Sequence, residues 1–283
     1  MKNILLPTDF SKNSINAINY AVKLFESIDC NFYILNVQKA SSFISDDLMS
    51  VSTSATIYNT LVDAAKKSII NIISQINKRS QNKNHTFHSI VDYDNFIDAI
   101  NQTSKIYGVD LIIMGTKGAS GLEKVVFGSN TVHVLQRCDI PVLAIPTGCK
   151  FKKLDTIAFT SSFRSSYCID DLLPLKELVF SNNSKLKILH VVEDYNFQEK
   201  LEENIEFFEN NFPQVIFDRI MSDDKDIYNV IQDYIVKNEV KMIAMVGKKH
   251  SFINRLFTRH SVETLAFNID IPFLVMHRSK DLA

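Results

Sequence analysis

The part of the sequence that decides the fold is LIIMGTKGASGLEKVVFGSNT, residues 111–131. It opens with four apolar residues and continues into a loop, residues 115–128, that holds four of the chain's seven glycines. A short apolar run that ends at glycine is typical of a central strand of a parallel sheet, buried on both faces. A helix is then expected from Ser129 to Arg137, so the order is strand, glycine-rich loop and helix.

Outward from this stretch, short apolar runs alternate with segments of helical period. A loop or an irregular helix start is expected at the Ser/Thr-rich residues 41–54, and Ser11 or Ser14 is placed to cap the first helix. We predict strands at residues 4–6, 32–37, 86–91, 111–114 and 142–145, and helices at 11–26, 61–76, 96–107 and 129–137. Such alternation indicates an α/β fold, with an open, doubly wound parallel sheet covered by helices on both faces.

The second half of the chain repeats the order of the first. Four segments match in sequence order, namely residues 157–163 with 4–10, 188–191 with 34–37, 242–247 with 112–115, and 270–274 with 139–143. We therefore expect a tandem repeat of two doubly wound domains, each with five strands in the order 3-2-1-4-5. Their expected bounds are residues 1–147 and 153–283, joined by a short polar linker. One continuous domain of nine or ten strands is the alternative.

Composition excludes several classes of protein. Of 283 residues, 46% are hydrophobic and 22% charged, and the net charge of −1 gives no field that would gather nucleic acid or an acidic membrane. The four cysteines form no C-x-x-C pair, which favours reduced thiols over a disulfide or metal framework. The apolar start is too short for a signal peptide, and no run approaches the ~20 apolar residues of a membrane span. We predict a soluble, cytoplasmic protein.

The glycine-rich loop has the features of a phosphate site. Glycines let the backbone approach a ligand closely, and a helix that opens at Ser129 directs amide groups and a helix dipole toward the same place. Ser129 and Thr131 could donate hydroxyls to phosphates or hold a metal ion. Glycines that only serve tight turns are the alternative. Neither the G-x-x-x-x-G-K-[ST] nor the G-x-G-x-x-G pattern occurs.

The spacing of this loop resembles that of the universal stress protein family. ATP-binding members of that family carry G-x2-G-x9-G-[ST], and this chain has the pattern at Gly115, Gly118, Gly128 and Ser129. The opening ILLPTD at residues 4–9 is similar to the family's first strand, and IPVL at 140–143 is similar to its last. The resemblance extends over both halves of the chain.

The resemblance implies that ATP is bound, with Mg²⁺ or Mn²⁺. Asp9 would contact the nucleoside, Pro7 would line the adenine pocket and Val37 would pack on the base. The phosphates would be surrounded by Gly115, Gly118, Gly128, Ser129, Asn130 and Thr131. From the residues themselves, the alternative for Asp9 is a turn or capping residue ahead of Ser11, and the alternative for Val37 is a core residue. The resemblance also implies that the last strands, residues 142–145 and 273–276, pair within one molecule, which permits further homo-oligomers.

The second domain departs from the pattern. Gly247 is kept, but His250 and His260 stand where the next two glycines would be, and Ser162 replaces the aspartate. Histidine lacks the backbone freedom of glycine and occupies space that phosphates need, so we expect no ordinary ATP binding there. A basic cluster is either a site for another anion or a solvated surface; its members are Lys248, Lys249, His250, Arg255, Arg259 and His260.

The sequence thus predicts an ATP-binding stress or signalling protein whose second domain acts as a pseudo-partner. H-E-x-x-H and G-x-S-x-G are absent, and no arginine finger is evident, so no catalytic residue is assigned. If it is an enzyme, it is at most a slow ATPase. A nucleotide-independent interaction module, with an empty glycine loop and residues 41–54 binding a partner, is the remaining alternative.

Overall fold

The computed structural model describes residues 2–38, 51–93, 95–117, 127–161, 163, 165–192, 200–221, 227–247 and 270–278. At residues 51–58, 191–192, 221 and 227–229 only the backbone is described. Several sequence predictions therefore lie outside the described residues: those for Gly118 and Ser162, for the basic cluster at 248–260, and for most of the segment 41–54.

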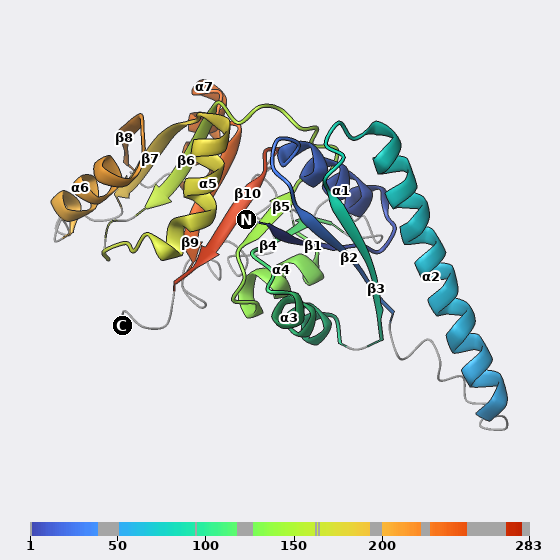
Figure 1. Ribbon diagram of the computed structural model, residues 1–283. Helices are drawn as coiled ribbons and strands as arrows, with labels where there is room; N and C mark the ends of the chain where they lie inside the picture. The colour runs from blue at the N-terminus through green and yellow to red at the C-terminus, as the bar shows by residue number, and fades with distance from the viewer. Residues whose placement is uncertain are drawn as a thin grey trace.

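Within the described residues, ten strands form one continuous sheet (Figure 1). The first half of the chain contributes β1 (Asn3–Pro7), β2 (Asn31–Val37), β3 (Thr86–Asp92), β4 (Leu111–Gly115) and β5 (Val142–Ile145). The second half contributes β6 (Thr156–Ser161), β7 (Lys185–Val192), β8 (Val215–Met221), β9 (Met242–Gly247) and β10 (Phe273–His277). The order across the sheet is β3-β2-β1-β4-β5-β10-β9-β6-β7-β8.

This order confirms the predicted fold class. Each half has parallel strands in the order 3-2-1-4-5, counted along its own chain. The two halves join where β5 pairs antiparallel with β10, with Leu143 opposite Leu274. The predicted pairing of the two last strands is confirmed too. Because the joint is antiparallel, the carboxyl ends of the strands in the two halves face opposite edges of the sheet.

Helices cover both faces of this sheet, as predicted (Figure 1). One apolar layer packs α1 (Lys12–Leu24), α2 (Val51–Arg79), α5 (Leu173–Asn182) and α6 (Leu201–Asn211) against the sheet. On the other face lie α3 (Phe96–Tyr107), α4 (Ser129–Arg137) and α7 (Ile227–Lys237). A 3-10 turn, η2 (Asp170–Leu172), precedes α5. Among the described helices, none is both long and apolar enough to cross a bilayer.

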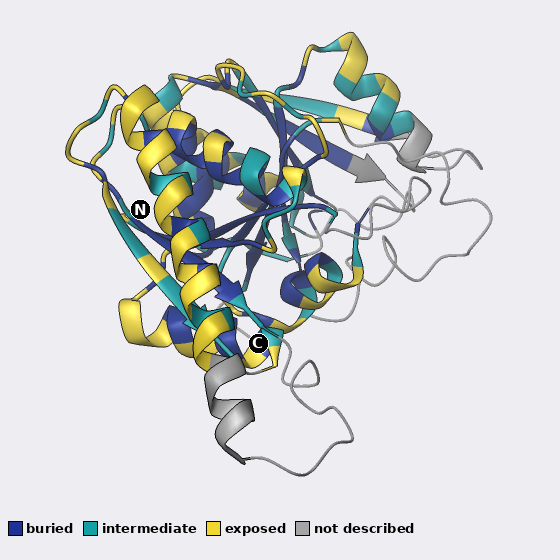
Figure 2. Cartoon of the chain, turned by 90° about the vertical axis from the view of Figure 1, so that its right-hand side faces the viewer, coloured by how far each residue is buried: buried dark blue, intermediate teal, exposed yellow. Residues whose placement is uncertain are grey.

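The core continues across the joint between the halves. Alternate residues of each strand face opposite layers, so Leu143 and Leu274 belong to the first layer, and Val142 and Val275 to the second. Figure 2 shows that buried residues concentrate in the strands, while the outer sides of the helices are exposed. A shared core of this kind holds the two repeats together as one body.

Local sequence explains most helix boundaries. Ser11 caps α1 as predicted, since its hydroxyl accepts from the backbone amide of Ser14 at 3.2 Å. The largest difference is α2, which begins at Val51, ten residues before the predicted start. Ser and Thr are only modest helix formers, and that composition indicated a loop. All four cysteines are described, and none of them is joined to another in a disulfide.

Candidate functional site

The candidate site lies at one edge of the first half's sheet. β1 pairs with β2 on one side and with β4 on the other, and the strand order reverses between β1 and β4. In open α/β sheets the crevice beyond the carboxyl ends at such a reversal is where ligands bind. The fold brings Pro7, Asp9, Val37 and Gly115 to this edge, because each ends or follows one of these neighbouring strands.

The turn after β1 is built on the hydroxyl of Thr8. This buried oxygen accepts from the amide of Phe10 at 3.0 Å and is hydrogen-bonded to the hydroxyl of Ser14 at 2.9 Å. Phe10 takes a positive φ of 62° to complete the turn. Asp9 is exposed, and its Oδ1 accepts from the amide of Ser11 at 3.1 Å. The carboxylate therefore orders the entry to α1, as the turn alternative requires, and does so at the ligand edge.

Sequence reasoning missed Asn36 at the end of β2. It is buried, and its amide nitrogen donates to the carbonyl of Thr8 at 2.7 Å, while its Oδ1 accepts from Gln38 at 2.6 Å. These bonds tie the carboxyl ends of β1 and β2 together. An asparagine inside the apolar strand FYILNV was the available signal, since a buried amide needs partners. Val37 is half-buried and packs on the second apolar layer, as its core alternative requires.

Gly115, at the end of β4, is required by packing. A Cβ at this position would lie 3.1 Å from the carbonyl oxygen of Asn13 and 3.2 Å from its carbonyl carbon. Both are backbone atoms of the first turn of α1, which cannot move aside as a flexible side chain can. The glycine thus lets α1 approach the end of β4. Beyond it, Thr116 donates its amide to Ile145 at 2.9 Å and accepts from the amide of Gly128 at 2.7 Å.

The start of α4 is fixed against this edge by Thr131. That residue is buried, and its hydroxyl donates to the carbonyls of Gly115 at 3.0 Å and Thr116 at 3.2 Å. Gly128 occupies the N-cap with φ −68°, and none of the described side chains makes a capping hydrogen bond with the helix. The first two helical residues, Ser129 and Asn130, are exposed. The first-turn amide groups of α4 therefore point out of the end of β4 with no capping side chain.

This arrangement suits an anion. Uncapped first-turn amides carry the positive end of the helix dipole, and the exposed side chains of Ser129 and Asn130 add polar groups beside them. Asp9 and Ser129 provide side-chain oxygens at the same edge that could act as ligands to a cation. Of the residues that the structure describes, no group of three or more His, Cys, Asp or Glu is placed to hold a metal ion. A cation here would depend on the oxygens of its ligand.

The equivalent edge of the second half has the same turn but different contents. Ser161 stands where Thr8 does: its hydroxyl accepts from the amide of Phe163 at 3.0 Å, and Phe163 has φ 50°. Six residues after Ser161, Tyr167 takes the place of Ser14, and the two hydroxyls are 2.6 Å apart. Burial raises the pKa of Tyr167.

Aromatic rings fill the space above this second turn. Tyr167 packs edge-on against Phe159 and lies 5.4 Å from Phe208, measured between ring centroids. His190, the counterpart of Asn36, lies 4.8 Å from the ring of Phe163. Burial lowers the pKa of His190, and the nearby positive charge of Arg219 adds to the effect. Arg278 extends over the ring of Tyr167 at 5.7 Å.

Comparisons with known proteins agree with this fold. The model of the universal stress protein family matches residues 1–146. Two universal stress proteins of Methanocaldococcus jannaschii are 25% identical over 144 residues and 26% identical over 153 residues; each covers 51% of this chain, and the matches span 81% and 94% of those proteins. A solved universal stress protein from Archaeoglobus fulgidus is similar over 99% of this chain and 97% of its own, with a TM-score of 0.70 at 19% identity. That likeness shows the shared tandem fold.

Proposed function

Since the chain belongs to the universal stress protein family, we propose that its first half binds ATP at the edge where β1 and β4 end. The second half serves as an attached partner that does not bind nucleotide. The protein would act in a stress response or in signalling in the cytoplasm, by holding the nucleotide rather than by turning it over.

The observation that carries this proposal is the start of α4, which no side chain in the described part of the chain caps and which the hydroxyl of Thr131 holds beside the end of β4. A triphosphate bound there would accept hydrogen bonds from the first-turn amides and gain from the helix dipole. Thr131 itself would act through the backbone, since its hydroxyl already donates to two carbonyls. Ser129 and Asn130, both exposed, would contact the phosphates directly.

The nucleoside would extend from the phosphates toward the ends of β1 and β2. Asp9 is exposed there, and a carboxylate at a strand end accepts well from ribose hydroxyls. Pro7 and Val37 would provide apolar contact for the base. A divalent cation such as Mg²⁺ or Mn²⁺ would neutralise phosphate charge; the hydroxyl of Ser129 is the protein oxygen best placed to reach it, and phosphate oxygens and water would provide its other ligands.

Among the described residues, the corresponding edge of the second half carries bulkier side chains, which we expect to disfavour a nucleotide there. Tyr167, which packs against Phe208, stands next to this turn at the position where the first half has the small side chain of Ser14. An exposed carboxylate corresponding to Asp9 is also missing, because Ser162 stands at that position. These differences support one nucleotide for each chain.

Two isosteric substitutions test the proposal. Asn130→Asp adds a carboxylate where the phosphates would bind, whereas Asn101→Asp makes the same change at an exposed position in the middle of α3. We expect Asn130→Asp to weaken ATP binding about tenfold or more through charge repulsion. The same substitution should raise helix stability by ~0.3–1 kcal/mol, because a carboxylate near a helix start is favourable. Asn101→Asp should change neither property.

Titration calorimetry with ATP and Mg²⁺ measures the affinity, and urea unfolding measures the stability. Lower affinity at unchanged or higher stability cannot come from misfolding, so that result would support the site. Equal ATP affinity in both variants would rule out the α4 edge as the phosphate site. No saturable binding of millimolar ATP to the wild-type chain would instead favour the nucleotide-independent interaction module, and phosphate release above background would favour an ATPase.

A further inference from the structure

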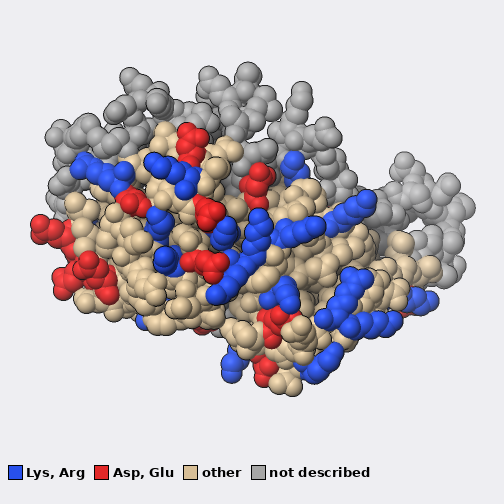
Figure 3. Space-filling model, turned by 90° about the horizontal axis from the view of Figure 1, so that it is seen from above, with Lys and Arg blue, Asp and Glu red and all other residues tan. Residues whose placement is uncertain are grey.

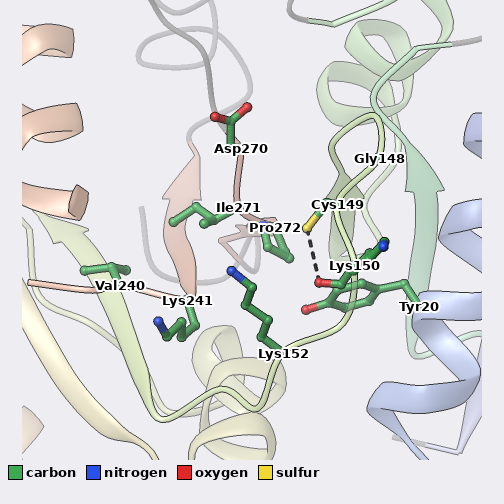
Figure 4. Close-up of a pocket in the computed structure, with 10 residues that line it drawn as sticks. All are labelled: Tyr20, Gly148, Cys149, Lys150, Lys152, Val240, Lys241, Asp270, Ile271 and Pro272. Atoms are coloured by element: carbon green, nitrogen blue, oxygen red, sulfur yellow. Dashed lines mark hydrogen bonds between the residues drawn. The ribbon is translucent and has the colours of Figure 1, made fainter.

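A cavity of about 350 Å³ lies between the two halves, beside the linker that follows β5. Its walls come from the linker after β5, from Tyr20 of α1, from the start of β9, and from residues 270–272 just before β10 (Figure 4). This volume is at the small end of the range of about 300–1,000 Å³ that is typical of ligand pockets. It suits a compact metabolite better than a nucleoside triphosphate.

The linker forms a fixed wall of this cavity. Gly148 turns the chain with φ 73°, a conformation that favours glycine, and the carbonyl of Cys149 accepts from the side chain of Asn16 at 3.0 Å. Phe151 packs edge-on against Tyr20, with 5.4 Å between ring centroids. The linker is therefore held against α1 on both sides of the cavity-lining residue Lys150, which keeps the shape of the cavity defined.

Positive charge gathers at the cavity. Its lining includes three lysines, Lys150, Lys152 and Lys241, and one carboxylate, Asp270. Lys152 comes from the linker and Lys241 lies immediately before β9; the side chain of Lys152 extends into the space between these walls, and that of Lys241 lies on the side of Val240 (Figure 4). Neither makes an ion pair with a described residue. Seen from above, Lys and Arg side chains also gather over the middle of this face (Figure 3).

A buried hydroxyl also faces the cavity. Tyr20 is only 3% exposed, and its hydroxyl makes no hydrogen bond with a described residue. Figure 4 shows this hydroxyl turned toward the cavity, beside the backbone of Lys150. Burial raises the pKa of Tyr20, so the hydroxyl keeps its proton and can donate to a ligand.

We propose that this cavity binds a small phosphorylated polyol, such as a sugar monophosphate. The two ammonium groups of Lys152 and Lys241 reach it from opposite walls and suit a phosphate dianion. Asp270 accepts hydrogen bonds from ligand hydroxyls, and Tyr20 donates one. The apolar wall of Val240, Ile271 and Pro272 packs against the carbon skeleton. The ligand would join the linker to the second half, at a site independent of the ATP edge.

Glucose 6-phosphate, inorganic phosphate and glucose are the probes for the full-length chain. Calorimetry should show saturable binding of glucose 6-phosphate, weaker binding of phosphate and none of glucose. A second readout uses Cys149, which is half-buried at the cavity: bound ligand should slow its alkylation by iodoacetamide, followed by peptide mass spectrometry. Cys168, half-buried but not part of the cavity lining, is an internal reference that should react at an unchanged rate.

Matched variants assign the anion contacts. Lys152→Met and Lys241→Met should each weaken binding of glucose 6-phosphate about tenfold or more, as expected when a charged hydrogen bond is lost. Lys153→Met is the control, because Lys153 lies outside the cavity lining and pairs with Asp155 at 3.4 Å. Tyr20→Phe removes only the hydroxyl and should weaken binding by a smaller factor. Asn130→Asp should leave this binding unchanged, which separates it from the ATP site.

Three outcomes would overturn the proposal. The first is no saturable binding of glucose 6-phosphate at millimolar concentration. The second is binding of glucose 6-phosphate that is as tight in Lys152→Met and Lys241→Met as in Lys153→Met. Binding that does not slow the alkylation of Cys149 counts in the same way. The third is equal affinity for inorganic phosphate and glucose 6-phosphate, which would exclude the polyol contacts with Asp270 and Tyr20.

Discussion

The carboxyl edges of the two halves share one turn and differ in what lies above it. In both, a hydroxyl at the strand end, on Thr8 or Ser161, accepts from the amide two residues later, and a phenylalanine there takes positive φ. Above the turn, the first half has the small side chain of Ser14 and the second has the ring of Tyr167. The backbone of this turn is the same in both halves, while the side chain bonded to its hydroxyl differs in size.

The largest expected effect comes from breaking the filled edge. Phe208→Ala removes a fully buried ring that contacts Phe159 and Tyr167, and should lower the free energy of unfolding by about 3–5 kcal/mol. Phe180→Ala is the matched control, since Phe180 is 53% exposed and should cost less than about 0.5 kcal/mol. Urea unfolding measures both. Similar losses in the two variants would show that the aromatic cluster does not stabilise the second half.

A middle-sized effect is expected where α4 is latched in the first half. Thr131→Val keeps the shape but leaves the buried carbonyls of Gly115 and Thr116 without this donor, at a cost of about 1–3 kcal/mol. ATP affinity should fall with it, because the start of α4 is no longer held. Thr131→Ser restores the hydroxyl and should recover most of both losses in unfolding and calorimetry. Recovery of stability without recovery of affinity would separate the latch from the nucleotide site.

A smaller effect compares the two turns directly. Ser14→Ala and Tyr167→Phe each remove one hydroxyl from the equivalent bond, to Thr8 in one half and to Ser161 in the other. Each should lower the free energy of unfolding by about 1 kcal/mol, the usual net value of such a bond. The comparison is read from paired urea curves. If the loss in free energy of unfolding were several times larger in one half, the two turns would be alike in geometry but not in their contribution to stability.

The smallest effect concerns pH. Burial and Arg219 hold the pKa of His190 below its ordinary value near 6.5, so the unfolded chain binds this proton more readily than the folded chain. The contribution of His190 to stability is therefore complete above pH 6.5 and is lost as pH falls through the folded pKa. His190→Asn installs the residue that the first half has at this position, and should flatten part of the stability decline between pH 7 and 5. If the stability of His190→Asn declined with pH as steeply as that of the wild type, the decline would come from other titratable groups.

Much of the fold was predictable because periodicity reports burial directly. The apolar run at 111–114 became the central strand β4, and the repeated segments became two halves with matching strand order. The alternative of one continuous domain agrees with the structure in one respect, because the ten strands form a single sheet. Helix length was harder: the Ser/Thr-rich start of α2 carries little local preference, and its helical state depends on the rest of the fold.

The candidate site was predictable in its location rather than in its contacts. Spacing identified the residues around the ends of β1 and β4, yet the glycine pattern did not distinguish a phosphate contact from the close approach of Asn13 to Gly115. Thr131 was expected to face the ligand, but its hydroxyl serves two carbonyls. Tyr167 and the cavity at Lys152 were not foreseen, because they depend on segments far apart in sequence that only packing brings together.

The antiparallel joint of β5 with β10 has a consequence for how the protein responds to dilution. Two separate chains paired through such strands would dissociate as their concentration fell, whereas here the partner strand is covalently tethered at high effective concentration. The first half thus keeps its unlike partner at any expression level. The one-to-one ratio of the two halves follows from their being one polypeptide and does not depend on concentration. Exchange of partners between copies therefore plays no part in forming this joint.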